Sequence, residues 1–280
     1  MAQTNASSIF KADGTTPELL TESYANLIDQ VQKSAIYTQL KNTEISGDPQ
    51  SGSVVARRLE SSLVKTYGTA RSAGFGDKIN NNGVTVNLDQ RKEIVQEVNQ
   101  FDVAQFGIPG MVDKRRDSFA LSMSAHLDRA FFTEAESAGA SVDVSGETTI
   151  VAKLEALIQS VETTSNDNVD GVDRAMIAVT VTPQVYGLLE NYIDTLPNVN
   201  GVSVPTFHGV EIYSNHRQTQ DAIAMMKGAV ALPVAIVGFE AGKIPLSNEI
   251  GMTIFFNYGV KGVMPDLIKY ADMVDEEVSA

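Results

Sequence analysis

Apolar residues recur with a helical period over residues 112–138, and polar residues occupy the remaining positions. The apolar positions are Val112, Phe119, Met123, Leu127 and Phe131. At about 1.5 Å per residue, such a helix spans roughly 40 Å, which is the width of a whole small domain. Gly139 follows the last residue of the pattern and is a typical helix stop. The pattern therefore predicts one long amphipathic helix that ends at Ala138.

The pattern changes to partial alternation on either side of a Gly- and Asn-rich segment. Residues 53–68 and 84–99 alternate as strands do, and residues 69–83 between them contain three glycines and three consecutive asparagines. This order predicts a long antiparallel ribbon with a mobile tip. A two-stranded ribbon is marginally stable by itself in water, so the ribbon needs a surface outside itself to lie on.

The rest of the chain mixes helical and strand patterns. We expect helices at about 17–40, 147–163 and 183–194, and strands at 176–183, 208–215 and 252–265. Residues 222–239 are apolar throughout and predict a helix followed by a strand. Pro183 suits the first turn of its helix, with Thr182 as the expected cap. The fold class predicted is α+β.

Composition and charge exclude several classes of function. The chain contains 21 Lys and Arg against 35 Asp and Glu, so its net charge is −14, and it has no Cys. A chain this acidic repels phosphate at long range, so it has no general attraction for nucleic acid or for anionic membranes. No apolar run approaches the ~20 residues of a membrane span, and the N-terminus lacks the pattern of a secretory signal. We expect synthesis in the cytosol and no membrane partner.

Motifs for catalysis or for cofactor binding are absent or incomplete. Residues 238–244 partly match the motif of a phosphate-binding loop. Ile244, however, stands where a Ser or Thr is required, so a turn between strands is favoured. Residues 166–171 resemble the start of a calcium loop, but Ile177 occupies the position of the bidentate acid, which favours an Asx-rich turn. His126, His208 and His216 show no ligand spacing. We predict no catalytic residues, no cofactor and no metal, and therefore no enzyme.

Four segments, taken in order, resemble the major capsid proteins of tailed double-stranded DNA bacteriophages, which have the Hong Kong 97-like fold. Residues 96–132 resemble the family's passage from an extended loop into its spine helix, including Asp102 and Asp128. Residues 179–193 resemble its strand–Pro–helix unit, 209–215 a strand that ends in Ser-Asn, and 255–270 its closing strands. The resemblance covers about residues 17–270.

The resemblance implies a division of the chain. The expected parts are an N-terminal arm with a helix (1–50), an extended β-ribbon loop (51–102), a peripheral domain with the spine helix (103–165), a mixed α/β axial domain (166–240), and strands returning to the peripheral domain with a C-terminal tail (241–280).

The resemblance also implies a function and partners. Such subunits form hexamers and pentamers and assemble in the cytoplasm of a bacterial host into the icosahedral capsid of a virion. The shell encloses double-stranded DNA without sequence-specific binding and contacts a portal. We expect a separate scaffolding protein or a scaffolding segment already removed, because no long N-terminal scaffolding segment is evident.

Cations on the predicted ribbon are candidate contacts between subunits. They are Arg57, Arg58, Lys78, Arg91 and Lys92. Each would face neighbours of net charge −14, which favours pairing with acidic side chains. Some family members join subunits covalently through a Lys on the extended loop and an Asn on a neighbour. Lys78 and Asn257 hold comparable places here, but neither context is diagnostic.

Two other functions stay open. The first shares the fold: an encapsulin-type compartment that encloses a cargo enzyme, which the contents of the purified shell would reveal. The second is a soluble α+β enzyme or binding protein with its site in residues 166–245, which would run as a monomer of roughly 30 kDa on a sizing column.

Overall fold

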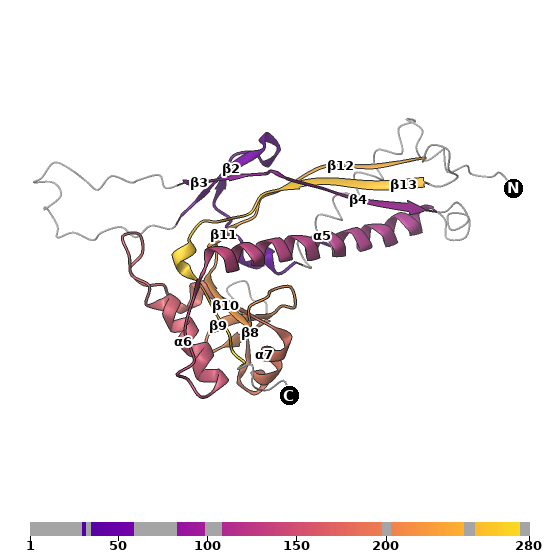
Figure 1. The fold of residues 1–280 in the computed structure, drawn as a ribbon. Helices are drawn as coiled ribbons and strands as arrows, with labels where there is room; N and C mark the ends of the chain where they lie inside the picture. The colour runs from indigo at the N-terminus through magenta and orange to yellow at the C-terminus, as the bar shows by residue number, and fades with distance from the viewer. Residues whose placement is uncertain are drawn as a thin grey trace, which may run out of the picture.

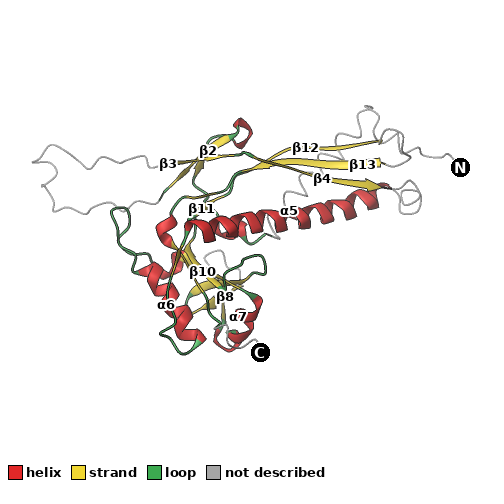
Figure 2. Ribbon diagram, viewed as in Figure 1, coloured by secondary structure: helices red, strands yellow, loops and turns green. Residues whose placement is uncertain are grey.

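The computed structural model describes residues 30–31, 35–58, 83–98, 108–197, 203–243 and 250–274. Within these residues, a long upper body made of a helix under a narrow sheet lies above a more compact lower domain built on a wider sheet (Figure 1, Figure 2). The helix and strand content confirms the predicted α+β class.

The long helix α5 (Ile108–Ala138) has 31 residues and runs along the upper body. It begins four residues before the predicted start, and Pro109 is tolerated because it falls in the first turn. Phe119, Leu127 and Phe131 are completely buried, which confirms the predicted apolar side. Gly139 has no room for a side chain, since a Cβ there would lie 2.8 Å from the carbonyl oxygen of Ala135.

A three-stranded antiparallel sheet lies above α5. Its order is β12 (Val234–Lys243), β13 (Ile250–Tyr258) and β4 (Gln90–Val98). β13 pairs with β4 from Ile250↔Val98 to Tyr258↔Gln90, so strands far apart in the sequence share their full length.

A second three-stranded sheet forms the base of the predicted ribbon. Its order is β1 (Ile45–Ser46), β2 (Ser53–Arg57) and β3 (Gly83–Asn87). β2 pairs antiparallel with β3 from Ser53↔Asn87 to Arg57↔Gly83, as predicted. The second half of the ribbon was predicted wrongly, because β4 leaves the ribbon and pairs with β13 instead. The alternating pattern is the same in both cases and does not say which strand is the partner.

The lower domain is built on a seven-stranded mixed sheet. Its order is β5 (Ala140–Ser141), β15 (Ile268–Ala271), β10 (Ala222–Met226), β6 (Ile177–Val181), β9 (Val210–Ser214), β8 (Ser203–Phe207) and β7 (Asp194–Pro197). β6 and β10 are buried at every position. The predicted helix within 222–239 was therefore wrong, since this segment forms β10, β11 (Val230–Ala231) and the start of β12. Periodicity does not separate a short buried strand from a buried helix.

Two helices accompany this sheet. α6 (Ile150–Glu162) is capped by Thr149, whose Oγ1 accepts a hydrogen bond from the N–H of Ala152 at 3.2 Å. α7 (Pro183–Leu188) starts at the predicted proline, and Thr182 holds the cap position without a side-chain capping bond. The remaining short elements are α2 (Tyr37–Leu40), η2 (Pro49–Ser51), η3 (Arg174–Met176), η4 (Glu190–Tyr192), β14 (Lys261–Gly262) and η5 (Pro265–Leu267). Most of the helix predicted at 17–40 lies outside the described residues.

Candidate assembly surface

Four of the five predicted contact cations lie among the described residues, in two pairs. Arg57 is the last residue of β2 and Arg58 follows it, whereas Arg91 and Lys92 lie near the start of β4 in a different sheet. Lys78 lies outside the described residues. The structure thus separates cations that the ribbon prediction placed on one surface.

The two cations at the end of β2 have different surroundings. Arg57 is exposed and makes no side-chain ion pair with any described residue. Arg58 has a side chain only 14% exposed, and its Nη2 donates to Oδ2 of Asp266 at 2.6 Å. Arg58 is therefore engaged within its own subunit, and Arg57 is the better candidate for a contact with a neighbour.

The cations at the start of β4 lie beside α5. Arg91 and Lys92 are exposed, and neither they nor Arg129 of α5 form an ion pair with any residue that the structure describes. Burial lowers the pKa of His126, and the positive charges of Lys92 and Arg129 lower it further, so this imidazole is neutral at pH 7.

An open recess of about 450 Å³ lies around His126, between α5, the start of β4 and the end of β13. His126 Nε2 lies 3.0 Å from the hydroxyl of Tyr258, and the two rings meet edge to face. The residues that line it are Asp89, Gln90, His126, Arg129, Ala130, Thr133, Glu134, Tyr258 and Val260. Glu134 also accepts the backbone N–H of Gly262 at 2.9 Å.

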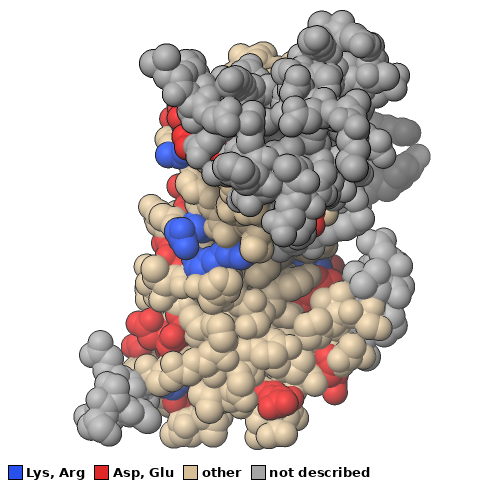
Figure 3. Space-filling model, turned by 90° about the vertical axis from the view of Figure 1, so that its right-hand side faces the viewer, with Lys and Arg blue, Asp and Glu red and all other residues tan. Residues whose placement is uncertain are grey.

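Seen along the long axis, Lys and Arg gather at mid-height, with Asp and Glu mostly lower (Figure 3).

Large apolar side chains are exposed at several places that the sequence analysis did not identify. Val237 is 65% exposed and Leu121 is 62% exposed, and the others are Val95, Met176, Leu188 and Tyr192. Helical spacing could have identified Leu121 as exposed, because it lies two residues after the buried Phe119 and so on the opposite side of α5. Val237 lies at a register shift between Ile236 and Gly238, which no sequence pattern marks. Exposed apolar residues of this size suit contacts with other chains.

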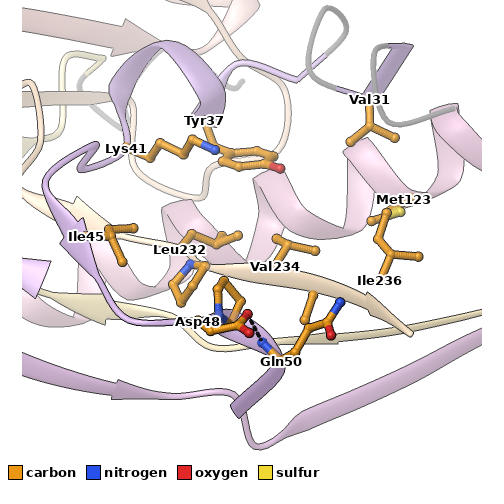
Figure 4. Close-up of a pocket in the computed structure, with 13 residues that line it drawn as sticks. Val31, Tyr37, Lys41, Ile45, Asp48, Gln50, Met123, Leu232, Val234 and Ile236 are labelled. Carbon is orange, nitrogen blue, oxygen red and sulfur yellow. Dashed lines mark hydrogen bonds between the residues drawn. The ribbon is translucent and has the colours of Figure 1, made fainter. Parts of the chain in front are cut away.

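A second cavity, of about 390 Å³, lies between α5, α2 and the start of β12 (Figure 4). Its apolar lining residues include Met123, Leu232 and Val234. Its polar lining residues are Tyr37, Lys41, Asp48 and Gln50, and the Asp48 carboxylate accepts the N–H of Gln50 at 2.9 Å. Lys41 Nζ lies 5.5 Å from the centre of the Tyr37 ring, and burial lowers the pKa of Lys41.

One buried carboxylate joins α5 to the lower domain. Asp128 is completely buried; it accepts the N–H of Tyr37 at 2.9 Å and pairs with Nη1 of Arg217 at 2.5 Å. Burial raises the pKa of Asp128, although these hydrogen bonds and the Arg217 charge oppose the rise. Glu136, two turns on, accepts the N–H of Thr219 at 2.7 Å. Arg217 and Thr219 lie between β9 and β10, so α5 holds this loop at two points.

The two incomplete motifs have structural roles. Residues 166–171 form an Asx turn, as predicted, in which Asn166 Oδ1 accepts the N–H groups of Asn168 and Val169 at 2.9 and 3.0 Å. Residues 238–244 were predicted as a turn; this was wrong for 238–243, which belong to β12, and Ile244 lies outside the described residues. Among the described residues, no group of three or more His, Cys, Asp or Glu is placed to hold a metal ion. Nor does any described helix combine the length and apolarity that crossing a membrane requires.

Comparisons with solved structures agree on one fold. A structure of Mycobacterium phage Che8 matches with a TM-score of 0.55 and 17% identity, over 79% of this chain and 85% of that chain. A virus-like particle from Pyrococcus furiosus matches with a TM-score of 0.57 and 12% identity, over 91% of this chain and all of that one. The capsid structure of the cyanophage P-SCSP1u matches with a TM-score of 0.54 and 13% identity, over 85% and 88% of the two chains.

The chain has the Hong Kong 97-like fold. In the terms of that fold, α5 is the spine helix, and the sheet of β4, β12 and β13 lies along it. No model of a known protein family matches the sequence, and no curated protein matches it either. At identities of 12–17%, the solved structures show a shared fold alone.

Proposed function

We propose that this chain is the major capsid protein of a tailed double-stranded DNA bacteriophage, which assembles as hexamers and pentamers into an icosahedral shell around the phage DNA. The supporting observation is the Hong Kong 97-like fold itself, shared over most of the chain with structures from two phages. The fold alone does not distinguish a capsid from an encapsulin-type shell.

The surface of the subunit supports assembly. Apolar side chains as large as Leu121 and Val237 are more than half exposed, and a shell would bury them between copies. Arg57, Arg91 and Lys92 form no ion pair with any described residue, and in a shell they would face neighbours of net charge −14. Each contact between copies needs little free energy, because closure of the shell multiplies many of them.

The net charge also suits a container for DNA. A subunit of charge −14 does not hold phosphate tightly, so packaged DNA can slide during filling. Scaffolding protein and portal are the further partners of this proposal.

Expression of the full chain, with and without a candidate scaffolding protein, tests the function by negative-stain microscopy. We expect rings, tubes or closed particles. A monomer of about 30 kDa that shows turnover of a small substrate would contradict the proposal. Particles purified from the native source should contain nuclease-sensitive DNA. An enclosed cargo protein in place of DNA would identify an encapsulin-type shell instead.

A further inference from the structure

Three segments distant in sequence meet at one carboxylate. Asp266 lies in η5, just before β15 of the seven-stranded sheet. Its Oδ2 accepts from Nη2 of Arg58 at 2.6 Å and from Nδ2 of Asn166 at 2.5 Å. Arg58 follows the last residue of β2 in the ribbon, and Asn166 lies in the loop between α6 and β6. The carboxylate thus joins the ribbon to two parts of the lower domain.

The ion pair between Arg58 and Asp266 forms only one of the two parallel hydrogen bonds that a guanidinium and a carboxylate can form. Arg58 Nε and Asp266 Oδ1 are both buried, and neither has a hydrogen-bond partner among the described residues. One is a donor and the other an acceptor, on side chains that are already bonded through Nη2 and Oδ2. A guanidinium and a carboxylate commonly form two parallel hydrogen bonds, and a buried polar group without a partner is costly. The second bond is therefore available and favourable if the two groups rotate slightly.

The partners belong to parts of the molecule that share no sheet. Arg58 follows the β1–β2–β3 sheet, whereas Asp266 and Asn166 flank strands β15 and β6 of the seven-stranded sheet. A change in the angle between the ribbon and the lower domain must alter the geometry of this pair. The second hydrogen bond lets the pair stay intact while that angle changes.

We propose that Arg58, Asp266 and Asn166 form a latch that sets the angle between the ribbon and the lower domain, and that this angle controls the curvature of the assembled shell. This inference rests on the proposed function. One-bond and two-bond forms of the latch serve the slightly different angles that subunits adopt in pentamers and hexamers. The three residues act as positioning residues, since they need not touch a neighbouring subunit themselves.

The position of Asp266 supports a permanently charged latch at neutral pH. Burial raises the pKa of this carboxyl, but the hydrogen bonds from Arg58 and Asn166 outweigh burial and hold the pKa below its ordinary value. The pair therefore keeps both charges while the angle changes.

Variants of Arg58 test the latch, with Arg129 of α5 as the control, because Arg129 is exposed and is not one of the predicted contact cations. Arg58→Ala should leave a folded, soluble subunit but reduce the yield of closed particles of normal diameter by about tenfold, in favour of open or irregular assemblies. Arg58→Lys keeps the charge but removes the two-bond geometry, so it should assemble into particles with a broader range of diameters. Arg129→Ala should close particles like the wild type. Particle diameters come from electron microscopy, and thermal unfolding of the subunit checks its fold.

A charge exchange separates a structural from a positioning role. Arg58→Asp combined with Asp266→Arg restores the ion pair and should recover subunit stability and at least part of the closure that Arg58→Ala loses. Should Arg58→Ala fail to fold, Arg58→Lys supplies the same measurement. Closed particles of wild-type yield and diameter from both single variants would overturn the latch but leave the proposed function intact. A wild-type chain that never forms assemblies would overturn both.

Discussion

Single polar side chains hold distant segments of this subunit together. Asn42 is 4% exposed and joins three segments. Its Nδ2 donates to the carbonyl oxygens of Arg57 and Gly228 at 3.0 and 2.9 Å, and its Oδ1 accepts the N–H of Glu44 at 2.8 Å. Because both the Nδ2 and the Oδ1 of this buried amide are hydrogen-bonded, the side chain fixes the ribbon base against the turn after β10.

Asn42→Asp should destabilise the subunit by about 2–4 kcal/mol, because a carboxylate cannot donate to the two carbonyl oxygens and would be buried beside them. Equilibrium denaturation in urea measures the loss. Asn191→Asp is the control, since Asn191 is exposed and its replacement should change the free energy of unfolding by less than about 0.5 kcal/mol. Equal effects of the two changes would contradict the role given to Asn42.

The latch carboxylate should give a defined pH dependence. The pKa of Asp266 is lowered in the folded state, so its contribution is complete above its unfolded-state pKa of about 3.9 and is lost as pH falls through the folded-state value. We expect Asp266→Asn to cost about 1 kcal/mol at every pH from 5 to 8, and the cost to shrink below about pH 4. Denaturation of both proteins across this range measures the difference. A cost that grows below pH 4 would refute the assignment.

At the scale of elements, close backbone approaches decide how the sheets join. Gly259 follows β13, and a Cβ there would lie 2.1 Å from the carbonyl oxygen of Asn87 at the end of β3. The two sheets of the upper body therefore meet where only a glycine fits. The long helix shows the opposite situation, since its large side chains Phe119 and Phe131 are completely buried.

Gly259→Ala should destabilise the subunit by about 1–3 kcal/mol, because the added methyl group pushes against backbone atoms that cannot rotate away. Gly187→Ala in α7 is the matched control, since nothing lies within 4 Å of its Cβ position. That change should stabilise the subunit by roughly 0.5–1 kcal/mol through helix propensity. Thermal unfolding should thus move in opposite directions for the two variants, and a shift in the same direction would contradict the packing described for Gly259.

At the scale of the whole molecule, one apolar core extends from the upper body into the lower domain. Polar contacts add to it, since Asp128 with Arg217, Glu136 with Thr219, and the latch at Asp266 each join an upper element to the lower domain.

Replacement of residues 59–82 by a short Gly-Ser linker should leave a folded subunit that no longer closes shells. Every described strand is retained, since Arg57 already pairs with Gly83. The sequence alone suggests removal of residues 60–95, but that change would delete β3 and most of β4 and so destroy two sheets. Sedimentation and microscopy measure closure. Shells of normal shape from the linker variant would show that the ribbon tip has no part in assembly.

Particular residues show how far the sequence alone could go. The positions of Phe119, Leu127 and Phe131 predicted α5 because a period kept over several turns has one interpretation. The short apolar segment Ala222–Met226 was predicted as a helix and forms a strand, because five buried residues fit either structure. Arg58 was predicted as a contact with a neighbour, but its partner Asp266 lies 208 residues away in the same chain.

The sequence by itself determined the long helix, the ribbon base, the mixture of helix and strand, and the order of elements that resembles a capsid subunit. These features depend on local spacing, turn residues and charge, all of which a linear pattern carries. Only the tertiary structure decided that β4 pairs with β13, that Val237 is exposed, and that Arg58 joins the ribbon to the lower domain. Those outcomes depend on which distant segments meet, and residues near one another in sequence do not determine that choice.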